Sequence, residues 1–226
     1  MARWEQIATT QIPQDGGELR LLTSNDDFAI RITGQSGDLM NSRMHSSEDA
    51  LATLACEPFE RCENARVLIG GLGMGFTLAA ALGVLPATAR VVVAELVPGV
   101  VDWNRGPLAD LAGRPLDDSR VQIETKDVAR LIRRARKPFH AIMLDVDNGP
   151  EGLTHEFNDQ LYSLAGLGAA FEALVPNGLL AVWSAGVDAR FTSRLKKIGF
   201  DVSEKWVRAH KGKGARHLIW LARRPK

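Results

Sequence analysis

Two carboxylates, Asp145 and Asp147, follow directly after the apolar run at residues 139–144. Two clustered acids in a partly desolvated pocket can hold a cationic amine and take a proton from it. A simple turn is the alternative for this segment, because Asp147, Asn148 and Gly149 are typical turn residues. A turn does not account for Asp145, because a carboxylate this close to a buried strand needs a partner. We therefore predict that Asp145 accepts the proton and that Asp147 helps to hold the amine.

A glycine-rich segment carries the second chemical signal. Gly71, Gly73 and Gly75 stand between the apolar run 67–69 and the helix-forming residues 76–82, which predicts a strand, a tight turn and a helix. Glycines let a ligand lie against the main chain, and the start of the helix offers N–H donors and a positive dipole end. A turn that only packs the helix on the strand is the alternative. We predict that the three glycines contact a nucleotide.

Two further acids close the next two predicted strands. Glu95 ends the strand after the glycine-rich turn, where a carboxylate can accept two hydrogen bonds from ribose hydroxyls. An ordinary solvated strand end is the alternative for Glu95. Asp127 follows the third predicted strand, where it can cap the next helix and face the base of a bound nucleoside. Capping alone explains Asp127 equally well, and the two roles are compatible.

These acids share a site only if their strands end at one edge of a sheet. After the first strand, strands are predicted at residues 90–96, 120–124, 140–145 and 179–183, and helices at 76–83, 98–105, 127–136, 159–174 and 188–197. The alternation predicts an α/β fold with a doubly wound, mostly parallel, Rossmann-like sheet, in which ligands bind beyond the carboxyl ends of the strands. Two last strands, at residues 201–206 and 217–222, are joined directly and must pair antiparallel.

The beginning of the chain has a different pattern. Apolar residues alternate on both sides of a polar turn, as in a β-hairpin: Leu19, Leu22, Phe28, Ile30 and Ile32. We predict a small β-rich N-terminal extension at residues 1–45 and a Rossmann-like nucleoside-binding domain at residues 46–226. Ser46 is expected to cap the next helix, with Glu48 and Asp49 as favourable acids of its first turn.

Composition narrows the functional classes. The chain has 226 residues, 45% of them hydrophobic, which suits one main core. With 28 Lys and Arg against 27 Asp and Glu, the net charge of +1 disfavours a nucleic-acid partner. No apolar run is long enough to span a bilayer and the first residues lack a signal core, so we expect a soluble, cytoplasmic protein. Cys56 and Cys62 have no neighbouring His or Cys cluster, which disfavours a disulfide scaffold and a metal site.

The glycine spacing separates two classes of nucleotide ligand. A dinucleotide fold has a third glycine three residues after the second. Here that position holds Phe76, so NAD and FAD are disfavoured. Three alternate glycines, with acids after the second, third and fourth strands, instead suit an adenosine that carries a sulfonium side chain.

The ordered motifs resemble those of the spermidine synthase family of aminopropyltransferases, a branch of the S-adenosylmethionine-dependent methyltransferase fold. Residues 67–75 are similar to the family's cofactor loop, 92–95 to its ribose-binding strand, 118–127 to the segment around its third strand, 145–150 to its catalytic aspartate strand end, and 161–178 to its following helix and turn. The N-terminal hairpin resembles the family's β-extension. The resemblance implies S-adenosylmethionine or decarboxylated S-adenosylmethionine as donor, a small-molecule amine as acceptor, and a homodimer.

Three departures from the family pattern leave alternatives open. Gly73 stands where the family's loop carries an aspartate for the amino end of the donor, and residues 44–49 replace a Tyr-His-Glu stretch near the polyamine pocket. Asp145 and Asp147 also replace an Asp-Ser-Ser-Asp spacing. A methyltransferase on the same fold, or a nucleoside-binding protein without catalysis, therefore stands beside the aminopropyltransferase as a hypothesis.

Overall fold

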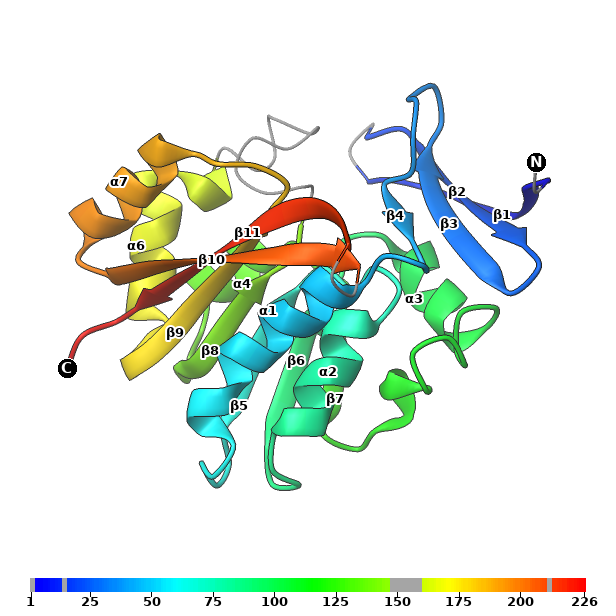
Figure 1. Ribbon diagram of the computed structural model, residues 1–226. Coiled ribbons are helices and arrows are strands. Elements are labelled where there is room, and N and C mark those ends of the chain that lie inside the picture. The colour runs from blue at the N-terminus through cyan, green and yellow to red at the C-terminus, as the bar shows by residue number, and fades with distance from the viewer. Residues whose placement is uncertain (1–2, 14–15, 147–159, 211–212) are drawn as a thin grey trace.

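The computed structural model describes residues 3–13, 16–146, 160–210 and 213–226. Their strands form two sheets, a four-stranded sheet near the N-terminus and a seven-stranded sheet farther along the chain. Figure 1 shows the smaller sheet beside one end of the larger sheet, next to α3 (Pro98–Arg105).

The larger sheet has the strand order β10-β11-β9-β8-β5-β6-β7. Its strands are β5 (Arg66–Gly70), β6 (Arg90–Ala94), β7 (Val121–Glu124), β8 (Phe139–Leu144), β9 (Leu174–Ser184), β10 (Asp201–His210) and β11 (Lys213–Arg223). Pairing is parallel from β9 through to β7, whereas β11 pairs antiparallel with both β9 and β10. The predicted doubly wound, mostly parallel sheet with an antiparallel C-terminal strand is confirmed.

Helices cover both faces of this sheet (Figure 1). Besides α3 they are α1 (Ser46–Cys56), α2 (Phe76–Val84), α4 (Val128–Arg133), α6 (Leu164–Glu172) and α7 (Ala189–Ile198), with short 3₁₀ helices η1 (Glu57–Phe59) and η2 (Pro115–Asp117). Successive strand residues point to opposite faces. Val67 and Ile69 therefore join a buried cluster with α1, α2 and α3, whereas Leu68 joins a second cluster with α4, α6 and α7. Burial on both faces explains the near-continuous apolar strands of the sequence.

The strand order reverses beside β5. The chain passes from β5 to β6 on one side and later places β8 on the other side, with Gly70 in register with Leu144. The crevice beyond the carboxyl ends of the strands at such a reversal is the usual ligand site of open α/β sheets. The fold thus brings together the segments that follow Gly70 and Leu144.

The four-stranded sheet extends the predicted hairpin. β2 (Glu18–Ser24) and β3 (Asp27–Ile32) pair antiparallel, and β1 (Glu5–Gln11) and β4 (Met40–Asn41) add one strand at each edge. The sequence did not predict β1 or β4, because β1 is largely exposed and polar and β4 has only two residues. Leu19 of β2 belongs to the same buried cluster as α1 and α2, so the smaller sheet packs against the main core.

Several element boundaries differ from the prediction, two of them for a clear local reason. Ser46 lies inside α1 instead of before it, because His45 occupies the cap position; the His45 ring bonds the Asp49 side chain at 2.8 Å and makes no capping bond to a main-chain N–H. β9 begins at Leu174, earlier than the predicted start at residue 179. Its pairing with β8 shifts register between Phe139 and Ala141, and this irregularity accommodates the turn-like residues at the start of the strand.

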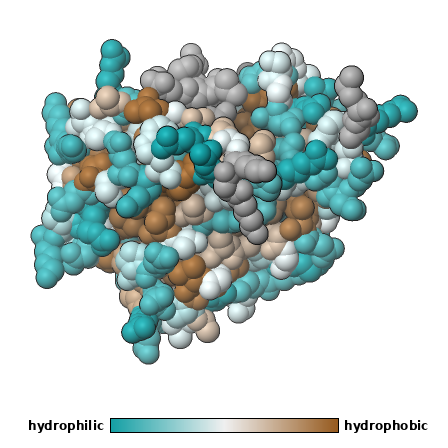
Figure 2. Space-filling model, in the orientation of Figure 1, coloured by the Kyte–Doolittle hydropathy of each residue, from teal (hydrophilic) through white to brown (hydrophobic). Residues whose placement is uncertain are grey.

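In the described part of the chain, none of the helices has the length and apolar character needed to cross a membrane. Figure 2 shows hydrophilic residues along the edges of the visible face and hydrophobic residues toward its middle. The large exposed hydrophobic side chains among the described residues are Ile7, Met44, Leu164, Val187 and Trp206. They come from separate segments, and scattered exposure of this kind is ordinary on protein surfaces.

Candidate functional site

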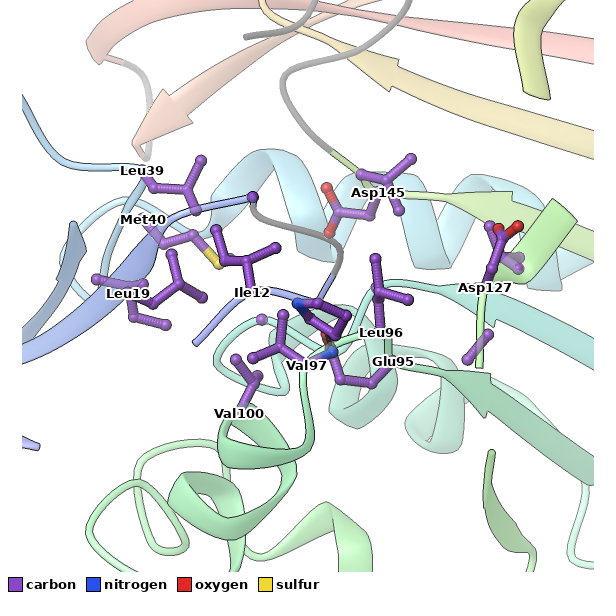
Figure 3. Close-up of a pocket in the computed structure, with 18 of the residues that line it drawn as sticks. Ile12, Leu19, Leu39, Met40, Glu95, Leu96, Val97, Val100, Asp127 and Asp145 are labelled. Carbon is purple, nitrogen blue, oxygen red and sulfur yellow. Dashed lines mark hydrogen bonds between the residues drawn. The ribbon is translucent and has the colours of Figure 1, made fainter. Parts of the chain in front are cut away.

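A cavity of about 600 Å³ lies at the carboxyl ends of the parallel strands. Gly71 and Gly73 after β5, Glu95 after β6, Asp127 after β7 and Asp145 after β8 all contribute to its wall. Figure 3 shows Glu95, Asp127 and Asp145 on the side of the larger sheet, and apolar side chains of the N-terminal sheet opposite them. The structure therefore brings five of the predicted site residues around one space that is large enough for a small-molecule ligand.

Gly71 lies where the ends of β5 and β8 meet. Its φ of +87° is in the left-handed region, and a Cβ atom at this position would stand 2.4 Å from the Asp145 carbonyl oxygen. Only glycine suits such a backbone at such a distance. The Gly71 N–H donates to the Ala94 carbonyl and the Asp145 N–H donates to the Gly70 carbonyl, both at 2.9 Å. These bonds fix the ends of three strands to one another.

The other two glycines of the loop meet different neighbours. Gly73 lines the cavity, and a Cβ atom there would stand 2.5 Å from Met40 Cε, so the Met40 side chain lies against this glycine. Gly75 is absent from the cavity wall that the described residues form. It caps α2 with a φ of +85°, and its Cβ position faces Asn104 Oδ1 at 3.0 Å. A nucleotide contact at Gly75 stays a prediction.

Two buried side chains hold the glycine-rich loop in place. Glu95 accepts hydrogen bonds from the Leu72 N–H at 2.9 Å and from the Val97 N–H at 2.8 Å. Asn104 Nδ2 donates to the Gly73 carbonyl at 2.8 Å. A carboxylate offers about four acceptor positions, so the predicted contact of Glu95 with a ribose is compatible with its two bonds to the main chain.

Asp127 caps α4. Its Oδ1 accepts a hydrogen bond from the Ala129 N–H at 2.8 Å, which confirms the predicted capping role. The side chain also lines the cavity next to Lys126, whose Nζ forms an ion pair with Glu124 at 2.6 Å. The contact of Asp127 with the base of a nucleoside stays a prediction.

Asp145 is the titratable group at the strand reversal. It follows β8, whose last four residues are buried, and its Oδ2 accepts a hydrogen bond from Thr77 Oγ1 at 2.7 Å. Burial raises the pKa of Asp145, and the Thr77 hydroxyl opposes this effect without cancelling it. A carboxyl group with a raised pKa holds a transferred proton better than a surface carboxylate does. Asp147, the second predicted catalytic acid, lies outside the described residues.

Glu48 is a cavity residue that the sequence analysis did not assign to the site. It stands in the first turn of α1 and lines the cavity. Burial, followed by the nearby charge of Asp145, raises the pKa of Glu48 to about 7, against the effect of a 2.6 Å hydrogen bond from Ser47 Oγ. Its place in the first helical turn suggested only an interaction with the helix dipole. The one sequence signal was that residues 44–49 replace a motif of the acceptor pocket.

Apolar side chains form the opposite wall of the cavity. From the N-terminal sheet and its loops come Ile12, Pro13, Leu19, Ile30, Ile32, Leu39 and Met40, and from the segment after β6 come Leu96, Val97 and Val100. Figure 3 shows Ile12, Leu19, Met40, Val97 and Val100 gathered on this side. The sequence predicted the hairpin but not its use as a cavity wall. A wall of this kind excludes water and strengthens electrostatic interactions inside the cavity.

Metal-ligating groups and thiols are the other candidates for chemistry among the described residues. In the described ranges, no group of three or more His, Cys, Asp or Glu side chains could hold a metal ion. Cys56 is buried and Cys62 is half-buried, both as free thiols. Burial raises the pKa of Cys56 to about 12, which makes this thiol a poor nucleophile. The acidic side chains of the described cavity wall are Glu48, Glu95, Asp127 and Asp145.

The contact at Gly71 can be tested by adding one methyl group. Gly71→Ala should destabilise the protein by about 1–3 kcal/mol, because alanine is strained in the left-handed backbone conformation. The clash of the new methyl group with the Asp145 carbonyl adds to this cost. Gly83→Ala in α2 is the matched control, since open space surrounds this position, and it should stabilise the helix by about 0.5–1 kcal/mol. Urea unfolding measures both changes, and equal stability of the two variants would contradict the close contact.

The raised pKa of Glu48 predicts a dependence of stability on pH. The folded protein keeps a proton on Glu48 that the unfolded chain releases between pH 4.5 and about 7. The associated stability is complete below pH 4.5 and is lost as the pH rises through about 7. Glu48→Gln should therefore be more stable than the wild type at pH 8, by about 1–3 kcal/mol, and no more stable at pH 4.5.

Urea unfolding at the two pH values measures this difference. Glu60→Gln is the control, because the Glu60 side chain is 55% exposed, and it should change stability little at either pH. The same pH dependence in the wild type and in Glu48→Gln would show that Glu48 titrates as a surface acid does.

Comparison with known proteins identifies the fold. No family model and no curated protein matches the sequence. The structure is similar to a spermidine synthase solved in complex with the transition-state analogue AdoDATO, with a TM-score of 0.74, 17% identity, and coverage of 97% of this chain and 72% of that chain. It is also similar to the spermidine synthase from Thermotoga maritima, with a TM-score of 0.74, 16% identity, and coverage of 97% of this chain and 72% of that chain. A probable spermidine synthase from Corynebacterium glutamicum is similar with a TM-score of 0.68, 15% identity, and coverage of 97% of this chain and 79% of that chain. The predicted spermidine synthase-like fold is confirmed.

Proposed function

We propose that the protein is a transferase that resembles spermidine synthase and moves a group from S-adenosylmethionine, or from its decarboxylated form, to a small-molecule amine. The observation that carries this proposal is the position of Asp145, a carboxyl group with a raised pKa at the strand reversal beside the glycine-rich loop. The likeness of the fold to spermidine synthases, one of them bound to a transition-state analogue, supports it.

The cavity suits a nucleoside with a sulfonium side chain. Its volume of about 600 Å³ falls in the range of small-ligand pockets. Gly71 and Gly73 bring main chain to the cavity wall, and Glu95 brings a buried carboxylate that can accept from ribose hydroxyls. Asp127 can accept a hydrogen bond from the amino group of an adenine. These groups lie in the order in which the base, ribose and loop contacts of a nucleoside would need them.

For transfer from a sulfonium donor to an amine, the protein needs only to hold the two substrates in place and to supply one base. The sulfonium of the donor supplies the activation, because its C–S bond breaks with the electron pair left on sulfur. An amine acceptor must first lose a proton to expose its lone pair, and Asp145 accepts that proton. The C–N bond forms, the new ammonium carries the positive charge that sulfur loses, and one proton stays on the protein. The cavity orients the two partners and keeps out water.

The charges of the cavity wall favour a cationic acceptor. Glu48, Glu95, Asp127 and Asp145 line the cavity, against Lys126 as the basic residue among its described neighbours. A protonated amine gains from this negative field, whereas a phosphate or carboxylate acceptor is repelled. The field therefore supports an amine as the acceptor class.

The role of Glu95 can be tested by ribose discrimination. If its carboxylate accepts from ribose hydroxyls, the wild type should bind methylthioadenosine about 10- to 100-fold more tightly than its 2′,3′-dideoxy analogue, because hydrogen bonds to a charged group contribute about 1.5–3 kcal/mol. Glu95→Gln should lose most of this discrimination. Calorimetry with the two ligands provides the four affinities.

Glu124→Gln is the matched control for this measurement. Glu124 ends the neighbouring strand and pairs with Lys126, so its variant should keep the discrimination. Thermal unfolding of each variant detects any loss of the loop structure that Glu95 holds. Equal discrimination in the wild type and in Glu95→Gln would exclude a ribose contact at Glu95.

The role of Asp145 can be tested by removing its basicity. Asp145→Asn keeps the shape of the side chain, so donor affinity should stay near that of the wild type, while turnover should fall about 10²- to 10⁴-fold. The wild type and the variant would each be given both donors with a panel of amines that includes putrescine. Chromatography separates the nucleoside products.

The product identifies the reaction. Methylthioadenosine leaves after aminopropyl transfer from the decarboxylated donor, and S-adenosylhomocysteine leaves after methyl transfer. An Asp145→Asn variant as active as the wild type would remove Asp145 as the base. A wild-type protein that binds a donor but releases neither product with any amine would contradict the transferase and favour a nucleoside-binding protein.

A further inference from the structure

A chain of hydrogen bonds links Glu48, a cavity residue of α1, to His217 of β11. Ser47 Oγ donates to Glu48 Oε2 at 2.6 Å, and His217 Nδ1 lies 3.0 Å from the same Ser47 oxygen. Glu48 lines the cavity, Ser47 is 1% exposed, and His217 on β11 is half-buried beside exposed residues. The chain therefore runs from the cavity, through a buried hydroxyl, to an imidazole near the surface.

The cavity end of this chain is a pair of acids. Glu48 from α1 and Asp145 from the end of β8 both line the cavity, and the charge of Asp145 acts on Glu48. Each carboxyl also accepts from one hydroxyl, Glu48 from Ser47 and Asp145 from Thr77. The pKa of each is raised by burial, and two carboxyl groups on one cavity wall that act on each other do not both ionise readily.

We propose that Glu48 and Asp145 act as one proton-accepting pair in the transfer reaction, and that Ser47 and His217 pass the proton from this pair toward solvent. The inference rests on the proposed transferase function, because it assigns the proton that an amine acceptor must lose. Glu48 is then a catalytic residue beside Asp145, and Ser47 and His217 are positioning residues that act through Glu48.

The balance of the reaction leaves one proton to be removed after each turnover. The amine arrives as an ammonium ion, gives one proton to the ionised pair, and forms the C–N bond while the C–S bond breaks. The product leaves as an ammonium ion and the sulfur leaves neutral, so one proton per turnover remains on the pair. One wall of the cavity is apolar and offers the proton no acceptor, whereas Ser47 and His217 offer it a path through the protein.

The Ser47 hydroxyl can donate its one proton either to Glu48 or to His217, so the hydrogen bonds of the series can reverse their direction. When Glu48 is ionised, Ser47 donates to it and accepts from the His217 Nδ1–H. When Glu48 holds the proton, it can donate to Ser47, and Ser47 can then donate to Nδ1 of the His217 tautomer that carries its proton on Nε2; Nε2 releases that proton to solvent, and the ring returns to this tautomer by exchange with water before the next turnover. Burial lowers the pKa of His217, so the ring is neutral near pH 7 and one of its nitrogens is able to accept.

Two acids and one tryptophan surround this series of hydrogen bonds. The other acids that act on Glu48 are Asp145, at the end of β8, and Asp49 on the same helix, and each raises its pKa. Trp183 packs edge-on against His217, with ring centroids 4.6 Å apart. It also lines the cavity, is 9% exposed, and its Nε1 has no hydrogen-bond partner among the described residues. A buried donor of this kind indicates that a further molecule completes the site.

The pH dependence of the reaction tests the pair. For the wild type, kcat/KM should rise tenfold per pH unit and level off near pH 7. In Glu48→Gln the inflection should move to lower pH, because Asp145 then titrates without a second acid beside it, and the plateau should fall about 10²-fold. Asp49→Asn is the matched control, since it removes a neighbouring acid outside the cavity wall, and its inflection should stay within half a unit of the wild type.

The dependence on buffer tests the path. Ser47→Ala and His217→Gln should keep the inflection near pH 7 but lower kcat about tenfold, and high concentrations of a small buffer such as imidazole should restore kcat by carrying the proton instead. A purely structural role of these residues would lower kcat without restoration. Full activity of both variants at low buffer concentration would overturn the path.

A titration without turnover separates this inference from the transferase proposal. Carboxyl ¹³C NMR of the full-length protein should show one carboxyl that titrates near pH 7 in the wild type and is missing in Glu48→Gln, and the ring ¹⁵N shifts of His217 should follow the same titration. If no combination of donor and amine gives a product, the proposed transferase function is wrong, even where the titrations show the expected coupling of Glu48 and His217. If transfer occurs but Glu48 titrates near pH 4.5 and its variant keeps the wild-type pH profile, the pair is overturned.

Discussion

The contact between the ends of β5 and β8 is the constraint on which the site depends. A Cβ atom on Gly71 would stand 2.4 Å from the Asp145 carbonyl, so the two backbones approach as closely as only glycine permits. The hydrogen bonds from Gly71 to Ala94 and from Asp145 to Gly70 tie the ends of β6, β5 and β8 together. The glycine-rich loop and the Asp145 carboxyl therefore keep a fixed relation, and a ligand on the loop meets the acid at a set distance.

Glu95 extends this constraint to the rest of the loop. Its two oxygens accept from the main chain on both sides of the cavity floor, at Leu72 and Val97, and Asn104 holds the Gly73 carbonyl from α3. Glu95, which the sequence predicted as a ligand contact, thus also holds two main-chain segments together. The two N–H donors fix the position of this carboxylate, so a contact with a ligand there would cost little further side-chain entropy.

The sequence predicted the sheet and most of its acids because both depend on local patterns. Apolar runs that end in Gly71, Glu95 or Asp145 indicate buried strands and their carboxyl ends without knowledge of distant contacts. Glu48 could not be found in this way, because its place at the cavity depends on how α1 packs across the sheet. β1 was missed for a related reason: an exposed edge strand needs no apolar alternation, and only its hydrogen bonds to β2 make it a strand.

The two cavity acids also explain how the site is prepared for a cation. In the described part of the chain neither Glu48 nor Asp145 takes part in an ion pair, and burial raises the pKa of both. One proton on the pair removes the repulsion that two anions on the cavity wall would feel. An ammonium ion that enters the cavity can replace this proton as the compensating charge, so binding of an amine favours the ionised pair that is able to deprotonate it. A site with a resident Lys or Arg beside these acids would lose that coupling, because the compensating charge would already be in place before the substrate arrives.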